Sequence, residues 1–255
     1  MPVIDKDLLC RLFSRCGLPL GGEMADRFCS YAELLCEWNE KMNLTAITDP
    51  EGIVRKHFLD SCLPLSMVDI KQGATLIDVG TGAGFPAIPL KILRPDLQVT
   101  LLDSLNKRLV FLSQVCQELG ISADIVHGRA EECAKAPSEK SGGKKQGRSS
   151  LRETRDYAVA RAVAGLGVLC EYCLPYVKPG GSFIALKGAD GESEANEAAR
   201  AVKELGGTVE SVIRYDLPSA DGSKGDARTL IVIKKIARTP DRYPRTKAKM
   251  DKFPL

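Results

Sequence analysis

The chain has 255 residues, of which 44% are hydrophobic, and 36 Lys and Arg against 33 Asp and Glu give a net charge of +3 at pH 7. This length suits one large α/β domain or one domain with a helical appendage. No apolar run reaches the roughly 18 residues of a membrane span, and the first residues, MPVIDKDLLCRLF, do not have the layout of a targeting peptide. Nine irregularly spaced cysteines suit a reducing compartment better than a disulfide framework. We therefore expect a cytoplasmic protein without a membrane segment.

Helical periodicity dominates residues 1–70, which are predicted to form an N-terminal helical segment packed on the core. Apolar side chains recur at helical spacing over residues 4–40, with a break at 17–22. Another helix is predicted over 50–62, because Asp49-Pro50-Glu51 is a favourable helix start.

Strands and helices alternate from Thr75 onward. The predicted strands are 75–79, 98–103, 123–127, 156–160, 181–187, 208–215 and 228–235, and the predicted helices are 86–93, 105–119, 165–174 and 191–205. This alternation indicates a parallel, doubly wound sheet with right-handed crossovers. Residues 218–225 are too few for a crossover helix, so the last two strands should pair antiparallel. The predicted fold class is therefore α/β and Rossmann-like, with seven mostly parallel strands and an antiparallel final strand over residues 71–240.

A strand, a glycine turn and a helix start follow one another in the sequence TLIDVGTGAGFPAIPL, which begins at Thr75. Its three glycines are Gly80, Gly82 and Gly84. Glycine tolerates positive φ, and Pro86 is favoured in the first turn of a helix. This order of elements builds a nucleoside- or phosphate-binding corner of an α/β sheet.

Two ligand classes, and the alternative of an ordinary strand-to-helix turn, are compatible with this spacing. From Gly82 the string fits the dinucleotide pattern G-x-G-x-x-G/A. From Asp78 it reads D-x-G-x-G-x-G, the first motif of class I, Rossmann-like S-adenosylmethionine (SAM) methyltransferases. Asp78 and Pro86 favour the second interpretation, because a dinucleotide strand normally stays apolar and a pyrophosphate needs the N–H that proline lacks. The antiparallel final strand is also typical of these methyltransferases.

Polar residues follow the carboxyl ends of the other predicted strands, where ligands of open α/β sheets bind. Asp103 lies roughly 20 residues after Gly80 and is placed to accept hydrogen bonds from ribose hydroxyls, although it could instead cap the next helix. Ala130 and Glu131 are placed to line an adenine slot. Arg161 is placed to meet the methionine carboxylate or a phosphate, and Lys187 is a second cation at the same edge.

Charge is segregated along the chain. Residues 234–252 contain eight Lys and Arg against two Asp, and residues 139–155 contain six against two Glu. Basic segments on a near-neutral body indicate contact with a polyanion, or else solvated tails. The polar, glycine-rich segment 139–150 is predicted to be a disordered insertion, with bounds of about 136–152. Cys170 and Cys173 are predicted to be buried thiols one helical turn apart, and no metal site is expected.

An ordered set of short blocks resembles the RsmG/GidB family, the bacterial 16S ribosomal RNA guanine-N7 methyltransferases. The matching blocks are Trp38-Asn39 with Asn43-Leu44-Thr45, Arg55 to Ser61, Ile77 to Pro86, Leu102 to Arg108, Arg129 to Glu132, Ala160 to Ala162, Leu186 to Gly188, and Tyr243 to Arg245. Two features depart from the family pattern, namely the insertion at 139–150 and a tail with Ala248 and Met250 where the family commonly has Gly and Pro. Both departures concern the predicted RNA-facing surface.

The resemblance implies SAM-dependent methyl transfer, with S-adenosylhomocysteine (SAH) as product, to N7 of a guanine in a loop of 16S rRNA or the small ribosomal subunit. The implied cofactor-binding residues are Gly80, Gly82, Gly84, Phe85, Asp103, Ala130, Glu131 and Arg161. N7 carries a lone pair and no proton, so alignment can replace a general base, and His57 and His127 are interpreted as structural. Asn39, Asn43 and Arg161 are candidates for positioning the acceptor, and the protein is expected to be a monomer.

RNA binding is the second implied requirement. The candidate RNA contacts are Arg55, Lys107, Arg108 and Lys187, together with Arg242, Arg245, Lys247 and Lys249 in a basic C-terminal tail at 241–255. Deletion of this tail is expected to weaken RNA binding and to leave SAM affinity intact. Two other functions stay open, a non-catalytic rRNA-binding assembly factor with a nucleoside pocket and a nicotinamide enzyme.

Overall fold

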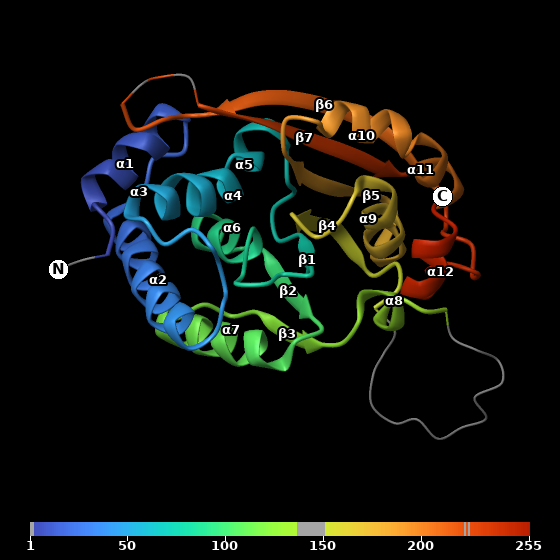
Figure 1. Ribbon diagram of the computed structural model, residues 1–255, viewed down its shortest axis with the longest axis horizontal. Coiled ribbons are helices and arrows are strands. Elements are labelled where there is room, and N and C mark those ends of the chain that lie inside the picture. Colours follow the sequence, from blue (N-terminus) through green and yellow to red (C-terminus); the bar gives the residue numbers. More distant parts are fainter. Residues whose placement is uncertain (1–2, 137–150, 222, 224) are drawn as a thin grey trace.

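The computed structural model describes residues 3–136, 151–221, 223 and 225–255, and across these residues seven strands form one sheet (Figure 1). The strands are β1 (Thr75–Val79), β2 (Gln98–Asp103), β3 (Asp124–His127), β4 (Arg155–Arg161), β5 (Val177–Lys187), β6 (Gly207–Leu217) and β7 (Asp226–Lys235), in the order β3-β2-β1-β4-β5-β7-β6. Strand β7 pairs antiparallel with β5 and β6, and the other pairs are parallel. The predicted fold class is confirmed.

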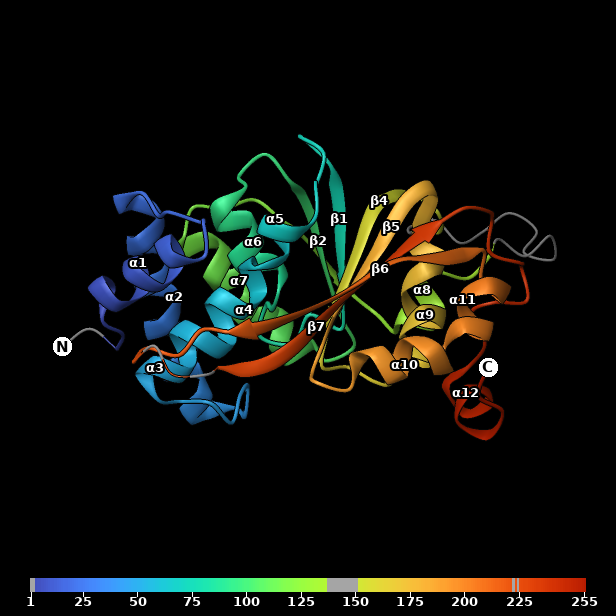
Figure 2. The ribbon, with the colours of Figure 1, turned by 90° about the horizontal axis from the view of Figure 1, so that it is seen from above.

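Helices cover both faces of the twisted sheet (Figure 2). They are α6 (Ala87–Leu93), α7 (Asn106–Glu118), α8 (Ala130–Cys133), α9 (Leu166–Cys173), α10 (Gly191–Glu197) and α11 (Ala199–Glu204), with a 3-10 turn over Leu174–Tyr176. Helices α6 and α7 lie on one face with the N-terminal helices, and α8 to α11 lie on the other. The helix predicted over 191–205 is divided into α10 and α11, and the short α8 was not predicted. Cys170 and Cys173 are fully buried on α9, as predicted.

The N-terminal residues form helices, as their periodicity predicts. These are α1 (Lys6–Arg15), α2 (Gly22–Lys41), α3 (Pro50–Gly52), a π-helix, η1 (Ile53–Leu59), α4 (Asp60–Cys62) and α5 (Pro64–Met67). The Asp49 carboxylate caps α3 by accepting the Gly52 N–H at 2.6 Å. The π-helical hydrogen bonding of η1 was not predicted, and such turns occur frequently at functional sites. No helix in the described part of the chain is long and apolar enough to cross a membrane.

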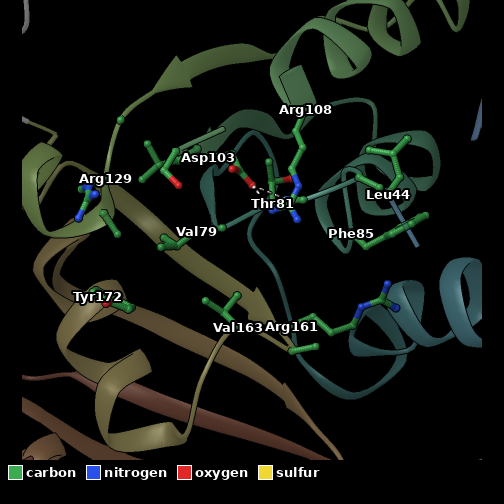
Figure 3. Close-up of a pocket in the computed structure, with 18 of the residues that line it drawn as sticks. Leu44, Val79, Thr81, Phe85, Asp103, Arg108, Arg129, Arg161, Val163 and Tyr172 are labelled. Atoms are coloured by element: carbon green, nitrogen blue, oxygen red, sulfur yellow. Dashed lines mark hydrogen bonds and ion pairs between the residues drawn. The ribbon is translucent and has the colours of Figure 1, made fainter. Parts of the chain in front are cut away.

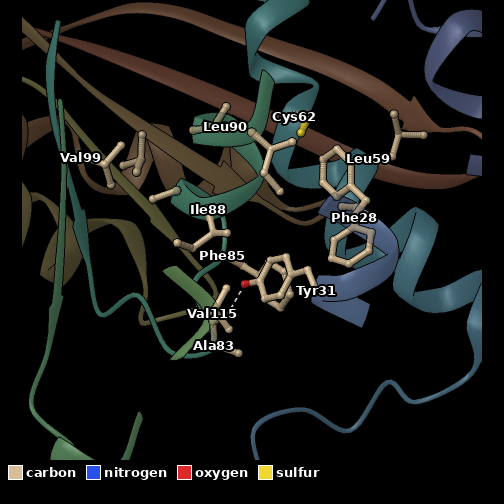
Figure 4. Packing of buried hydrophobic residues seen from close by; sticks show 14 of the residues in the cluster. Phe28, Tyr31, Leu59, Cys62, Ala83, Phe85, Ile88, Leu90, Val99 and Val115 are labelled. Atoms are coloured by element: carbon tan, nitrogen blue, oxygen red, sulfur yellow. Dashed lines mark hydrogen bonds between the residues drawn. The ribbon is translucent and has the colours of Figure 1, made fainter. Parts of the chain in front are cut away.

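Buried aromatic rings connect these helices to the glycine turn (Figure 4). The Tyr31 ring centroid lies 5.3 Å from that of Phe58 and 5.5 Å from that of Phe85. The Tyr31 hydroxyl also donates to the Ala83 carbonyl. Gly84, at φ +97°, brings its backbone against the Tyr31 hydroxyl, so an added Cβ would lie 2.5 Å from that oxygen. The N-terminal helices thereby hold the turn in place.

The C-terminal residues fold back on the sheet domain and end in α12 (Lys247–Lys252) (Figure 1). Arg152 is buried beneath this segment and donates to the carbonyls of Thr239 and Tyr243, the latter at 2.8 Å. Arg152 was included in the approximate bounds of the predicted insertion, but it is held in the fold. The predicted disorder of 139–150 concerns residues outside the described part of the chain.

Candidate functional site

A cavity of about 600 Å³ opens at the carboxyl ends of β1 to β4 (Figure 3). Seven of the eight predicted cofactor-binding residues line it, namely Gly80, Gly82, Phe85, Asp103, Ala130, Glu131 and Arg161. Gly84 does not line the cavity, because its backbone is packed against Tyr31. Arg129 and Tyr172 lie at one end of the cavity, and Phe85 and Arg161 lie at the other.

The floor of the cavity is the glycine turn. Gly80 and Gly82 have φ values of +74° and +59°, which favour glycine. The Gly80 N–H donates to the Leu102 carbonyl at 2.9 Å, and the Gly82 N–H donates to the Asp103 carboxylate at 3.0 Å. The turn is therefore tied to the end of β2, and its backbone faces the cavity without side chains from the two glycines.

The Asp103 carboxylate fixes the backbone at the start of α7 and also lines the cavity. One carboxylate oxygen accepts the Leu105 N–H at 2.8 Å, which fixes the start of α7, and the other accepts the Gly82 N–H. Arg108 lies 3.4 Å from the second oxygen. A carboxylate has about four acceptor positions, so Asp103 retains lone pairs that can accept hydroxyl donors from the cavity.

Asp78 supports the turn from below and is absent from the cavity wall. Its carboxylate accepts the Thr81 hydroxyl at 2.8 Å and the Ala87 N–H at 3.2 Å. The side chain is fully buried, and this burial raises the pKa of Asp78 to about 7. The polar residue in the first motif is thus a brace between β1, the turn and α6.

Arg161 and two stacked rings form the opposite end of the cavity. The guanidinium of Arg161 donates to the Lys56 carbonyl of η1 at 2.9 Å and lies 4.9 Å from the centroid of the Phe85 ring. Phe85 stacks on His57 with ring centroids 4.5 Å apart. Burial, together with the nearby Arg161, lowers the pKa of His57 to about 4. His57 is therefore neutral at neutral pH, and its Nε2 pairs with the Thr45 hydroxyl at 2.8 Å.

The other predicted positioning residues and His127 have distinct environments. Asn39 accepts the N–H groups of Leu44 and Thr45 at 2.8 and 2.9 Å, and thereby fixes a loop that lines the cavity. Asn43 is exposed and lies outside the lining. His127 pairs through Nε2 with the Ser104 carbonyl at 3.0 Å.

The predicted RNA contacts outside the tail differ in their exposure and in their partners within the protein. Lys107 is exposed on the first turn of α7, and Arg108 lines the cavity. Arg55 donates to the Pro218 carbonyl at 2.6 Å and pairs with Glu51 at 3.1 Å.

Three basic side chains of the C-terminal segment differ in accessibility. Arg242 is 70% exposed, and Lys249 is exposed on α12. Arg245 instead forms an ion pair with Glu171 of α9. The Glu171 side chain is only 1% exposed. Its backbone N–H and Nε donate to Oε1 at 2.6 and 2.9 Å, and Nη2 donates to Oε2 at 2.7 Å.

Lys247 and Tyr172 line the cavity beside Ala130 and Glu131. Tyr172 was missed as a lining residue, and Lys247 was assigned only to RNA. Neither position belongs to the glycine motif or follows a strand, so no local signal identifies them. Tyr172 belongs to α9, and the Arg245–Glu171 pair holds the C-terminal segment that carries Lys247 against the same helix.

Comparisons with known proteins agree with this architecture. The family model of rRNA small subunit methyltransferase G matches residues 24–219. Proteins named ribosomal RNA small subunit methyltransferase G are 47% identical in Alkaliphilus metalliredigens, over 94% of each chain, and 47% identical in Acetivibrio thermocellus, over 98% of this chain and 96% of the relative.

Solved structures share the fold at low identity. M. jannaschii TYW2 in complex with AdoMet has a TM-score of 0.53 at 9% identity, over 75% of this chain and 80% of that one. A SAM-dependent methyltransferase from Aquifex aeolicus has a TM-score of 0.50 at 17% identity, over 78% and 97%. The sheet order, the glycine turn and the match over most of the chain lead to one assignment: the chain belongs to the rRNA small subunit methyltransferase G family.

Proposed function

We propose that this protein transfers a methyl group from SAM to N7 of a guanine in 16S rRNA. The observation that carries the cofactor assignment is the cavity over the glycine turn, with the Asp103 carboxylate on its wall and side-chain-free backbone on its floor. The family to which the chain belongs supports rRNA as the acceptor.

The residues present fit the chemical groups of SAM. Asp103 would accept hydrogen bonds from the ribose hydroxyls, and Ala130 and Glu131, with Tyr172, would surround the adenine. The methionine portion would follow the backbone of Gly80 and Gly82 toward Arg161. These assignments use an acidic group for hydroxyl donors and a cation for a carboxylate.

The residues near the reacting end provide alignment and exclude water. SAM supplies an electrophilic methyl group on a positively charged sulfur. Guanine N7 has a free lone pair, so its attack requires no protein base, and His57 is neutral and already paired with Thr45. Phe85 and Val163 contribute apolar surface to the wall. Holding the reactants in line can supply a large part of the rate acceleration.

Two measurements test this proposal. Calorimetry should detect SAM binding by the wild-type protein, and binding should stabilise the fold by about 2.7 kcal/mol at a hundredfold excess over Kd. Purified protein with labelled SAM should then methylate small-subunit rRNA, and mapping should place the label at guanine N7. SAM binding without transfer to free rRNA or to the small subunit would refute catalysis and favour the assembly factor. Label at another atom would refute the N7 assignment.

A further inference from the structure

A second cavity, of about 360 Å³, adjoins the first beside the ends of β4 and β5. The two cavities share His57, Arg161 and Ala162 as wall residues. Ligands bound in the two cavities would therefore contact these three residues from opposite sides or share them. The shared wall lies at the Phe85 and Arg161 end of the first cavity, opposite Tyr172 (Figure 3).

The shared wall contains an unusual backbone conformation. Ala162 has φ +55°, a left-handed value that is uncommon for residues other than glycine. Such conformations cost of order 1–3 kcal/mol and cluster at ligand and active sites. The wall also includes the π-helix η1, whose Lys56 carbonyl holds Arg161. Two rare backbone features thus meet where the two cavities join.

The second cavity carries an excess of positive charge. Its basic side chains are Lys56, Arg161, Lys187 and Arg228, and its acidic side chains are Asp60 and Glu194. Lys187 pairs with Glu194 at 2.7 Å, and Lys56 lies 3.8 Å from Asp226 just outside the lining. Arg161 and Arg228 then share a single carboxylate, Asp60, so the excess of positive charge remains. A recess with this balance attracts a ligand that bears phosphate.

The remaining carboxylate, Asp60, is buried but loosely bonded. Its side chain is 7% exposed, and its oxygens lie 3.4 Å from Arg161, 3.4 Å from Arg228 and 3.4 Å from the Tyr215 hydroxyl. Charge-assisted hydrogen bonds are normally about 2.7–2.9 Å long. Asp60 therefore retains acceptor capacity that closer hydrogen-bond donors on a ligand can use.

Guanine presents the complementary chemistry. Its Watson–Crick edge carries two adjacent donors, N1–H and the 2-amino group, and N7 lies on the opposite side of the purine. Adenine presents an acceptor at N1, which a carboxylate repels. Enzymes that modify a base commonly read this edge after the base has left its stack.

We propose that the second cavity binds the acceptor guanosine, with Asp60 accepting hydrogen bonds from N1–H and the 2-amino group and with the surrounding cations facing its phosphate. This inference rests on the proposed function and adds a site and a specificity residue to it. With the donor edge at Asp60, N7 makes no contact with this carboxylate and keeps its lone pair free for the methyl group. Arg161 and Arg228 hold the carboxylate on either side.

The reaction balances in this arrangement without a proton acceptor. The N7 lone pair forms the new N–C bond, the C–S bond of the sulfonium breaks, and its electron pair stays on sulfur. The guanine ring gains the positive charge that sulfur loses. The Asp60 carboxylate stabilises that charge, because it lies next to the ring that acquires it.

The test uses the full chain saturated with SAH and compares GMP, IMP and AMP as ligands by calorimetry. IMP lacks the 2-amino group, and AMP lacks both donors. In wild-type protein we expect GMP to bind roughly tenfold more tightly than AMP, the effect of one bidentate base contact, with IMP between them. Asp60→Asn should abolish this preference while SAH still binds, which shows that the cofactor site is still formed. Asp190→Asn is the matched control, because Asp190 is exposed, makes no side-chain cap and lies outside this lining.

A second variant tests the cavity without changing charge. Gly188 lines the cavity, and a Cβ added there meets no atom within 4 Å, so we expect the fold to accommodate Gly188→Val. This variant should weaken GMP and AMP alike, and thermal melting should verify that both variants fold. The inference is overturned if wild-type protein binds GMP no better than AMP at millimolar concentration, or if Asp60→Asn keeps the preference. Absence of SAH and SAM binding would instead refute the proposed function.

Discussion

The ion pair between Arg245 and Glu171 holds the C-terminal segment beside the first cavity, where we propose that SAM binds, and Lys247 of this segment lines that cavity. Arg245→Met would leave the Glu171 carboxylate buried without a cation, and breaking a buried pair in this way costs about 3–5 kcal/mol. The chain can avoid this cost by releasing residues 241–255, which lets water reach Glu171. We therefore expect the loss to appear as local opening of this segment and not as global unfolding.

Limited proteolysis measures that opening. A loss of about 3 kcal/mol raises the open population by a factor of roughly 100, and cleavage by trypsin tracks this population when closing is fast. Cleavage at Lys247 and Lys249 should accelerate accordingly. SAM affinity should also fall, because Lys247 lines the cavity. The sequence-based expectation that deletion of the tail leaves SAM affinity intact predicts the opposite result, so the measurement decides between them.

Two controls separate the ion pair from a general effect of charge. Arg242→Met removes an exposed arginine 3.7 Å from Glu204 and should change stability by less than about 0.5 kcal/mol. Glu171→Leu combined with Arg245→Met replaces both charges by apolar groups and should recover most of the resistance to trypsin. Wild-type cleavage rates and SAM affinity in Arg245→Met would refute the role assigned to this pair.

Three further predictions concern the glycine turn and its acids. Asp103→Asn should lower SAM affinity roughly tenfold by calorimetry, because it replaces the charged acceptor proposed for the ribose hydroxyls by a neutral one. Unchanged affinity would refute the contact between Asp103 and the ribose. Gly84→Ala should destabilise the fold by about 3 kcal/mol in urea unfolding, since φ is +97° and the new Cβ would meet Tyr31. Gly82→Ala, where the new Cβ has no atom nearer than 3.9 Å, should cost about 1 kcal/mol. Asp78 has a pKa of about 7 in the fold against 3.8 in the unfolded chain. Between these two pH values the folded protein therefore keeps a proton on Asp78 that the unfolded chain has released. Its contribution to stability should fall by about 1.4 kcal/mol per pH unit as pH rises from about 4 to 7, and Asp78→Asn should remove that slope in urea titrations.

Local patterns determined the features that were predicted correctly. The apolar runs and the glycine turn specify strands and backbone geometry within a few residues, so β1 and β2 begin and end where they were expected. The short connection at 218–225 was enough to predict the antiparallel pairing of β6 and β7. Positions at strand ends, such as Asp103 and Arg161, follow from the same pattern, because a parallel sheet gathers its carboxyl ends at one edge.

Features that depend on distant partners could not be predicted in this way. The periodicity of 50–62 indicates a helix but does not distinguish π-helical from α-helical hydrogen bonding, since that choice depends on packing. Likewise, the charge of Arg245 indicates a phosphate contact as readily as an ion pair. Its partner, Glu171, lies 74 positions away in the sequence, and only the fold brings them together.

The location of Arg161 explains why the strand-end pattern alone could not specify its role. The side chain faces three environments at once, the Phe85 ring, the backbone carbonyls of η1 and the carboxylate of Asp60. A cation that bound only the methionine carboxylate would not need this second set of partners on the N-terminal helices. Because Arg161 belongs to the walls of both cavities, a movement that disturbs Asp60 also changes the end of the cofactor cavity. The proposed acceptor and cofactor sites therefore share one buried guanidinium, and we expect a ligand at one site to affect binding at the other.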